Sequence, residues 1–297
     1  MRLASAALLF LSASLAMHAQ TYSSGQPVIP AYEGWEKNED GSFSLVFGYM
    51  NENWQEEPTI PVGADNSFSP GPADQGQPTH FLPRRNRFIF RIRVPKDFGT
   101  KELAWSLTSH GETNKAFASL RPDLILEPVD LMSETGALGA GTSSPAIRAD
   151  KPPVLTLDVP KTLTARVDHP VTLTATMTDD GMPKPRIKPA PDSLSTAMSR
   201  KPNRITVQKN LGLHLSWFLY RGPGRATFDP AQIKIWEDTR AGANSPWAPL
   251  WFPPPETPDH KYSVKVTFSE PGTYLICARA DDGYLTTDEM VTITVAR

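Results

Sequence analysis

Apolar and polar residues alternate along much of this chain, which is the pattern of β-strands with one buried face. Residues 87–94, RFIFRIRV, show it most clearly: Phe88, Phe90, Ile92 and Val94 are predicted to point inward and the arginines outward. Other strands are predicted at residues 21–40, 42–50, 103–107, 124–126, 154–157, 163–167, 171–177, 205–207, 226–236, 262–268, 273–280 and 291–295. The 30 prolines and 19 glycines are typical of turn-rich sheets. The pattern therefore predicts an all-β protein with two β-sandwich domains.

The stretch 211–220, LGLHLSWFLY, is predicted to be the central strand of the second sandwich, with Trp217 on its buried face. Residues 271–280 begin with a Pro-Gly turn and carry Tyr274 at the entrance of a strand, the position of a tyrosine corner. Together the two strands indicate an immunoglobulin-like sandwich. Cys277 lies out of phase with its apolar neighbours and is the only cysteine, so no disulfide can form within the chain.

Changes in composition divide the chain. Residues 28–130 are predicted to form the first β-domain, and residues 153–297 the second. Between them, residues 131–152 are rich in Gly, Ala, Ser and Thr without any period, which indicates a linker. Within the first domain, residues 51–82 form a long irregular segment, and loops of this length are usually functional or braced by their own side chains.

The segments VTLTATMTDDG, LSWFLYRGPGRATFDP and VKVTFSEPGTYLICARADDGYLTTDEMVTITV resemble, in this order, the PKD-type immunoglobulin-like domains of exported bacterial proteins. The resemblance covers residues 153–297 and implies a non-catalytic module of a surface, periplasmic or secreted protein. It does not extend to the insertions at 182–203 and 237–261.

The first residues predict export. A basic start is followed by an apolar run and by a small residue at a suitable cleavage position, so residues 1–19 are predicted to be a signal peptide. The run is too short to remain as a membrane span. We therefore expect a periplasmic or extracellular protein, with no membrane insertion of the mature chain.

Charge and motifs exclude several functions. Lys and Arg total 30 against 32 Asp and Glu, a balance that gives no global field for nucleic acid. The sequence has no G-x-S-x-G, P-loop or H-E-x-x-H motif, so we expect no catalysis and no cofactor apart from a structural cation. An enzyme with its site in loop 51–82 stays as an alternative, and its candidate residues are Glu56, Glu57, Asp65, Asp74 and His80.

Two Asp-Asp-Gly turns are candidates for a calcium site. Asp179 and Asp180 end one predicted strand of the second sandwich, and Asp281 and Asp282 end another. Loops that join alternate strands gather at one end of such a sandwich, so these four carboxylates are expected to meet. Ca²⁺ prefers carboxylate and carbonyl oxygens, although Asp and Gly are also simply good turn formers.

An insertion at residues 237–260 is the candidate binding site. Trp236, Trp247, Trp251 and Phe252 lie in or beside this proline-rich loop, and aromatic faces on a stiff loop suit a glycan or a protein partner of the cell envelope. The alternative is that the rings cap the sandwich. We expect a binding or scaffolding protein, with an accessory carbohydrate-binding protein as the second hypothesis.

Overall fold

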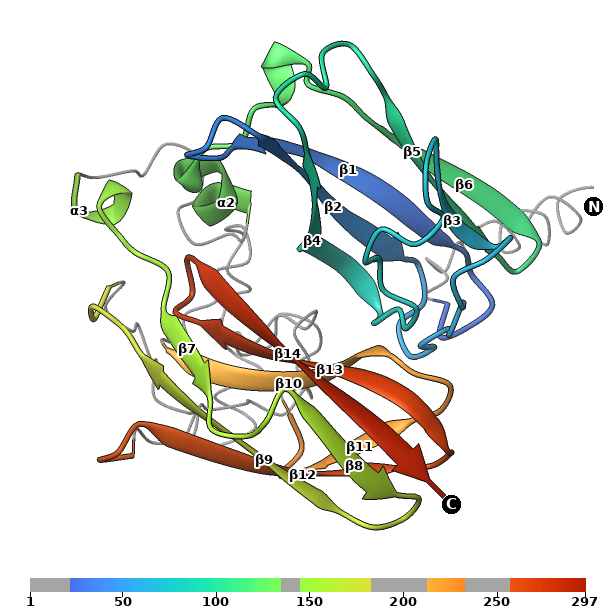
Figure 1. Cartoon of the computed structure of the whole chain (residues 1–297), viewed down its shortest axis with the longest axis vertical. Helices are drawn as coiled ribbons and strands as arrows, with labels where there is room; N and C mark the ends of the chain where they lie inside the picture. The colour runs from blue at the N-terminus through green and yellow to red at the C-terminus, as the bar shows by residue number, and fades with distance from the viewer. Residues whose placement is uncertain (1–21, 135–144, 183–212, 233–256) are drawn as a thin grey trace, which may run out of the picture.

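The chain is almost entirely β-structure in the computed structural model, which describes residues 22–134, 145–182, 213–232 and 257–297 (Figure 1). The strands of the first half form two three-stranded sheets, and those of the second half form two four-stranded sheets. The predicted all-β class, with two sandwiches, is confirmed. No helix in the described ranges is long and apolar enough to cross a membrane.

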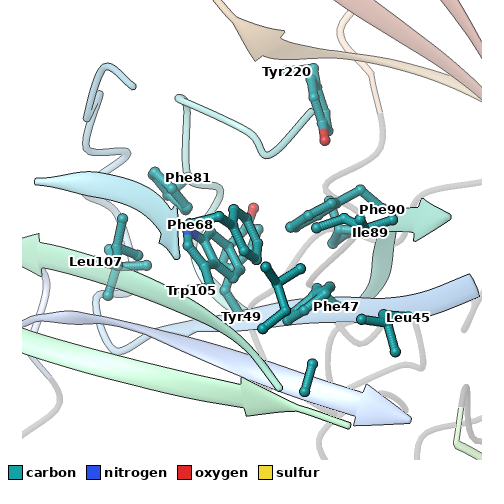
Figure 2. Close-up of a cluster of buried hydrophobic side chains, with 14 of the residues drawn as sticks. Leu45, Phe47, Tyr49, Phe68, Phe81, Ile89, Phe90, Trp105, Leu107 and Tyr220 are labelled. Atoms are coloured by element: carbon teal, nitrogen blue, oxygen red, sulfur yellow. The ribbon is translucent and has the colours of Figure 1, made fainter. Parts of the chain in front are cut away.

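The first sandwich has the sheet orders β1-β2-β4 and β3-β5-β6. Its strands are β1 (Val28–Lys37), β2 (Phe43–Asn51), β3 (Asn66–Ser69), β4 (Arg84–Val94), β5 (Leu103–Ser109) and β6 (Glu112–Ala118). Trp105 lies at the centre of its core and contacts Phe47, Phe68 and Phe90 from three other strands (Figure 2). The indole NH of Trp105 donates to Asn66 Oδ1 at 2.9 Å, so its polar atom is satisfied inside the core.

The strict alternation predicted for residues 87–94 is wrong at its beginning. Phe88 is only half-buried and has φ 54°, whereas Ile89 is buried. Phe47 pairs with Phe90 but Tyr49 pairs with Asn86, so β4 carries extra residues opposite Gly48. Asn86 and Phe90, on either side of the irregularity, are both buried, but the residues between them do not alternate, which periodicity alone does not reveal.

Two further differences concern short elements of the first sandwich. The strand predicted at 124–126 is a 3-10 helix, Pro122–Leu124, followed by a single bridge between Ile125 and Trp35. Strand β6 was not predicted, because its sequence ETNKAFA has few large apolar residues. It follows β5 through a tight hairpin in which His110 and Gly111 both have positive φ.

The second sandwich has the sheet orders β10-β13-β14-β8 and β11-β12-β9-β7. Its strands are β7 (Val154–Leu157), β8 (Thr162–Arg166), β9 (Val171–Thr178), β10 (His214–Arg221), β11 (Ala226–Asp229), β12 (Lys261–Phe268), β13 (Gly272–Asp281) and β14 (Thr286–Ala296). Trp217 is 2% exposed and pairs with Ala278 on β13, as predicted. The Tyr274 hydroxyl donates to the carbonyl of Glu270 at 2.8 Å, which confirms the tyrosine corner.

Strand β10 is buried on both faces, not on one. Trp217 and Leu219 belong to the core of the second sandwich, whereas Phe218 and Tyr220 pack with the core of the first. Cys277 on β13 also faces the first core, out of phase with its neighbours as predicted. The sheet β10-β13-β14-β8 therefore lies between two cores.

Loop 51–82 docks on the last residues of β10. The Tyr220 hydroxyl donates to the carbonyl of Gly76 at 2.6 Å, and the amides of Thr79 and His80 donate to the carbonyl of Tyr220, both at 3.2 Å. Arg221 adds a two-pronged ion pair with Asp74. Tyr220 lies beside the ring cluster on the side of the second sandwich (Figure 2).

The segment predicted as a linker contains ordered structure in its described parts. Helix α2 (Pro128–Glu134) buries Met132 against Leu285 of the second sandwich, and α3 (Pro145–Arg148) leads to Asp150. Asp150 is buried, 8% exposed, although composition alone had placed it in a solvated linker.

Candidate functional site

The acidic residues of loop 51–82 do not converge. Glu57 pairs with His80 at 2.9 Å, and Glu56 with His110 at 3.0 Å. Asp74 is held by Arg221, which lowers the pKa of its carboxyl, and Asp65 is exposed at the surface. Each carboxylate therefore has a separate position and role. Of the five residues predicted as an enzyme site, the structure brings Glu57 and His80 into contact.

His80 also lies near a hydroxyl group. Thr59 Oγ1 is 3.3 Å from His80 Nδ1, and the two residues form an isolated antiparallel bridge. A nucleophilic triad consists of a hydroxyl, an imidazole and a carboxylate that are hydrogen-bonded in this order. Here the same row joins neighbouring backbone segments, and the backbone of His80 is bonded to Tyr220. Its evident role is to brace the loop.

Two arginines after this loop, Arg84 and Arg85, contact groups other than its carboxylates. Arg85 pairs with Glu33 of β1 at 2.7 Å, and Arg84 donates to the carbonyl of Glu52. The guanidinium of Arg84 lies 4.4 Å from the centre of the Trp54 ring. Glu33 is deeply buried, which raises the pKa of its carboxyl despite the arginine. The Arg85–Glu33 pair thus joins β4 to β1 across β2, and Arg84 joins β4 to the segment that follows β2.

The two Asp-Asp-Gly turns have the same local geometry. Asp179 Oδ2 accepts from the amide of Gly181 at 2.9 Å, and Asp281 Oδ1 accepts from the amide of Gly283 at 2.7 Å. A carboxylate that accepts from the amide two residues ahead closes an Asx turn. Turn formation therefore accounts for one oxygen of each first aspartate.

Asp150 lies close to both turns, which sequence analysis did not foresee. Burial and the charges of Asp180 and Asp179 raise the pKa of Asp150 to about 6. Burial and the charge of Asp150, among others, raise the pKa of Asp282 to about 8, although the amides of Leu285 and Tyr284 oppose the shift. Asp150 thus connects electrostatically the two turns that were predicted to meet. A lone aspartate before Lys151-Pro152-Pro153 gives no sequence signal for this position.

Several oxygens of this cluster lack partners. Among the described residues, no hydrogen bond reaches either carboxylate oxygen of Asp150, Asp179 Oδ1 or Asp282 Oδ2, and all four atoms are buried. No group of three His, Cys, Asp or Glu side chains in those ranges is arranged, as it stands, to hold a metal ion. The carboxylates are therefore near one another but not drawn together around one point.

The predicted aromatic site lies outside the described residues. This applies to Trp236, Trp247, Trp251 and Phe252, so that site stays a prediction. The described surface does show one exposed tryptophan, Trp54, which is 38% exposed and backed by Arg84. Its amide donates to the carbonyl of Tyr22, another exposed aromatic residue.

No protein-family model matches the chain, and no curated protein sequence matches it. Similar solved structures include domains 4 and 5 of the S-layer protein SbsC, 8% identical over 67% of this chain and 66% of that one, with a TM-score of 0.25. A chimeric titin Z1Z2 is 11% identical over 90% and 97% of the two chains, TM-score 0.24. The D00-D0 domain of Intimin is 10% identical over 90% and 100%, TM-score 0.24.

These values are too low to carry an argument, so the class of protein is defined by the chain's own strands and core. The second half is an immunoglobulin-like β-sandwich, with a core tryptophan on β10 and a tyrosine corner at β13.

Proposed function

We propose that the chain is an exported, non-catalytic binding or scaffolding protein whose second half is a PKD-type module. The observation that carries the proposal is the docking of loop 51–82 on β10. This loop is the natural place for an enzyme site, yet its backbone and its Asp74 are committed to holding the two sandwiches together. A rigid pair of sandwiches suits a protein that presents loops to a partner.

The distribution of charge in the loop supports this proposal. General acid-base chemistry needs titratable groups that converge on one reacting position. Glu56, Glu57 and Asp74 instead point to three different cationic or imidazole partners. Each pair fixes a different part of the loop, which is the arrangement expected of a structural brace.

The partner is proposed to be a protein or a glycan of the cell envelope, bound by the aromatic residues of the insertion at 237–260. Tryptophan side chains offer a large rigid surface and lose little conformational entropy on binding. Trp247 and Trp251 lie among prolines in the sequence, and restricting a loop before it binds lowers the entropic cost of binding.

An accessory carbohydrate-binding role is the second candidate. It is favoured by Trp54, whose ring is exposed while Arg84 stacks on it. An aromatic face beside a guanidinium offers both stacking and hydrogen-bond donors to a sugar ring.

The experiment is a glycan array together with a pull-down from cell-envelope extract, using the exported chain. Loss of binding in the double variant Trp247→Ala and Trp251→Ala, with an unchanged Tm, supports the insertion as the binding site. Trp54→Ala tests the second candidate, because loss of glycan binding in this variant alone would assign the sugar to Trp54. If the double variant lowers Tm and leaves every interaction intact, the rings are structural and the site assignment is wrong.

Export is tested separately by cell fractionation. The full chain is expected in the periplasm or medium, and a variant without residues 1–19 in the cytoplasm. Equal distribution of the two forms would contradict export by this segment.

A further inference from the structure

We propose that Ca²⁺ binds between Asp150, Asp179 and Asp282 and fixes the segment before β7 to the end of the second sandwich. The inference uses none of the residues of the aromatic insertion. It does not depend on which partner the protein binds.

The strand pairing brings the three aspartates into one region. Val154, the first residue of β7, pairs with Thr178, the residue before Asp179. The Thr287 hydroxyl at the start of β14 donates to the carbonyl of Pro153. The chain just after Asp150 therefore passes between the end of β9 and the start of β14, where the two Asp-Asp-Gly turns lie.

The carboxylate oxygens without hydrogen-bond partners matter because they are buried away from water. Asp282 is 1% exposed; its Oδ1 accepts from the amides of Tyr284 and Leu285, but no described group reaches its Oδ2. Asp150 is 8% exposed, and neither of its oxygens has a partner among the described residues. A buried carboxylate without compensation is costly, so this cluster requires either a cation or bound protons.

Ca²⁺ fits the donor set better than other common ions. The free groups are all carboxylate oxygens, which are hard ligands, and Ca²⁺ completes its six to eight positions with carbonyls and water. Mg²⁺ demands near-ideal octahedral geometry, and Zn²⁺ favours nitrogen and sulfur.

The site is not preformed, so rearranging its side chains costs free energy and the affinity for Ca²⁺ is expected to be low. No three of the described acidic side chains surround a common point as they stand, so they must rotate toward the ion. Asp179 is only half-buried and Asp180 is exposed, which leaves room for that movement. We expect a dissociation constant of about 10⁻⁴ to 10⁻³ M, the range of extracellular calcium modules.

Binding would stiffen the joint between the two halves of the chain. Helix α2 already contacts the β13–β14 turn through Met132 and Leu285. An ion on Asp150 and Asp282 would hold the same turn from the side of β7. The described parts of the 131–152 segment would then be attached to the second sandwich at two positions.

The test compares the thermal unfolding of the exported chain at about pH 7.5 with about 10 mM CaCl₂ and with EDTA. At 10 to 100 times the dissociation constant, Ca²⁺ is expected to raise Tm by about 3 °C or more. Calorimetric titration with CaCl₂ should give one site. Asp150→Asn and Asp282→Asn keep the size of the side chain and one acceptor oxygen but remove the charge, and each is expected to reduce the affinity at least tenfold.

Asp65→Asn is the matched control, because it removes the same charge from an exposed position of the first sandwich. It should bind Ca²⁺ like the wild type. Asp179→Asn, at a half-buried position of the proposed site, covers the case in which a buried variant fails to fold, and it is also expected to reduce the affinity at least tenfold. If Ca²⁺ does not change the Tm of the wild type, the proposal is overturned, and bound protons compensate the buried carboxylates instead. An equal effect on all variants would place the ion elsewhere and overturn it as well.

Discussion

Truncation of Tyr220 tests whether the two sandwiches unfold as one cooperative unit. Tyr220 is 4% exposed and belongs to the first core, although its strand also carries Trp217 in the second. If this packing unites the halves, Tyr220→Ala should weaken both of them. Wild-type protein is then expected to unfold in one cooperative transition, and Tyr220→Ala in two.

The magnitude follows from what the side chain contacts. Replacing a buried aromatic ring by Ala costs about 3 to 5 kcal/mol. Tyr220→Phe keeps the ring and removes only the hydrogen bond to Gly76, for about 0.5 to 1.5 kcal/mol. Since domains are stable by about 5 to 15 kcal/mol, the Ala variant loses a large share of its stability and the Phe variant a small one.

The assay is urea denaturation followed by tryptophan fluorescence and far-UV circular dichroism. Trp105 and Trp217 report on different sandwiches, so Trp105→Phe and Trp217→Phe backgrounds would assign each transition. Coincident wild-type and Tyr220→Ala curves would refute the reasoning, because a side chain between two cores cannot be lost without cost. Two separate transitions in the wild type would contradict coupling of the two cores through β10.

Three further outcomes are expected. Trp217→Ala should destabilise the second sandwich by about 3 to 5 kcal/mol in urea titration, and an unchanged midpoint would contradict its core position. Gly222→Ala should lower the urea midpoint by an amount equivalent to about 1 to 3 kcal/mol, because a Cβ there would overlap the Tyr274 ring. In EDTA, the carboxyls of Asp150 and Asp282, whose pKa values are raised to about 6 and about 8, bind protons more tightly in the folded chain. Their stabilising contribution is present below about pH 4 and is lost as the pH rises through 6 to 8. Tm should therefore fall between about pH 5 and pH 8.5, and a flatter profile is expected for Asp282→Asn.

Local patterns were sufficient for most strands. Alternation at period two located β5, β9 and β12 to within a few residues, because one face of each meets a core and the other meets solvent or small polar residues. The tyrosine corner was also readable, since Tyr274 and its Pro-Gly turn are close in sequence. The bulge in β4 and the hairpin strand β6 were not, because both depend on pairing with other strands and not on local hydrophobicity.

The sequence by itself determined the all-β class, the core position of Trp217 and the two acidic turns, since each follows from neighbouring residues. Only the tertiary structure decided that β10 is buried on both faces, because that requires loop 51–82 to meet Tyr220 from more than 100 residues away in the chain. Only the tertiary structure placed Asp150 beside both turns. A solvated aspartate and a buried one are the same letter in a sequence, and they differ through the strands that surround them.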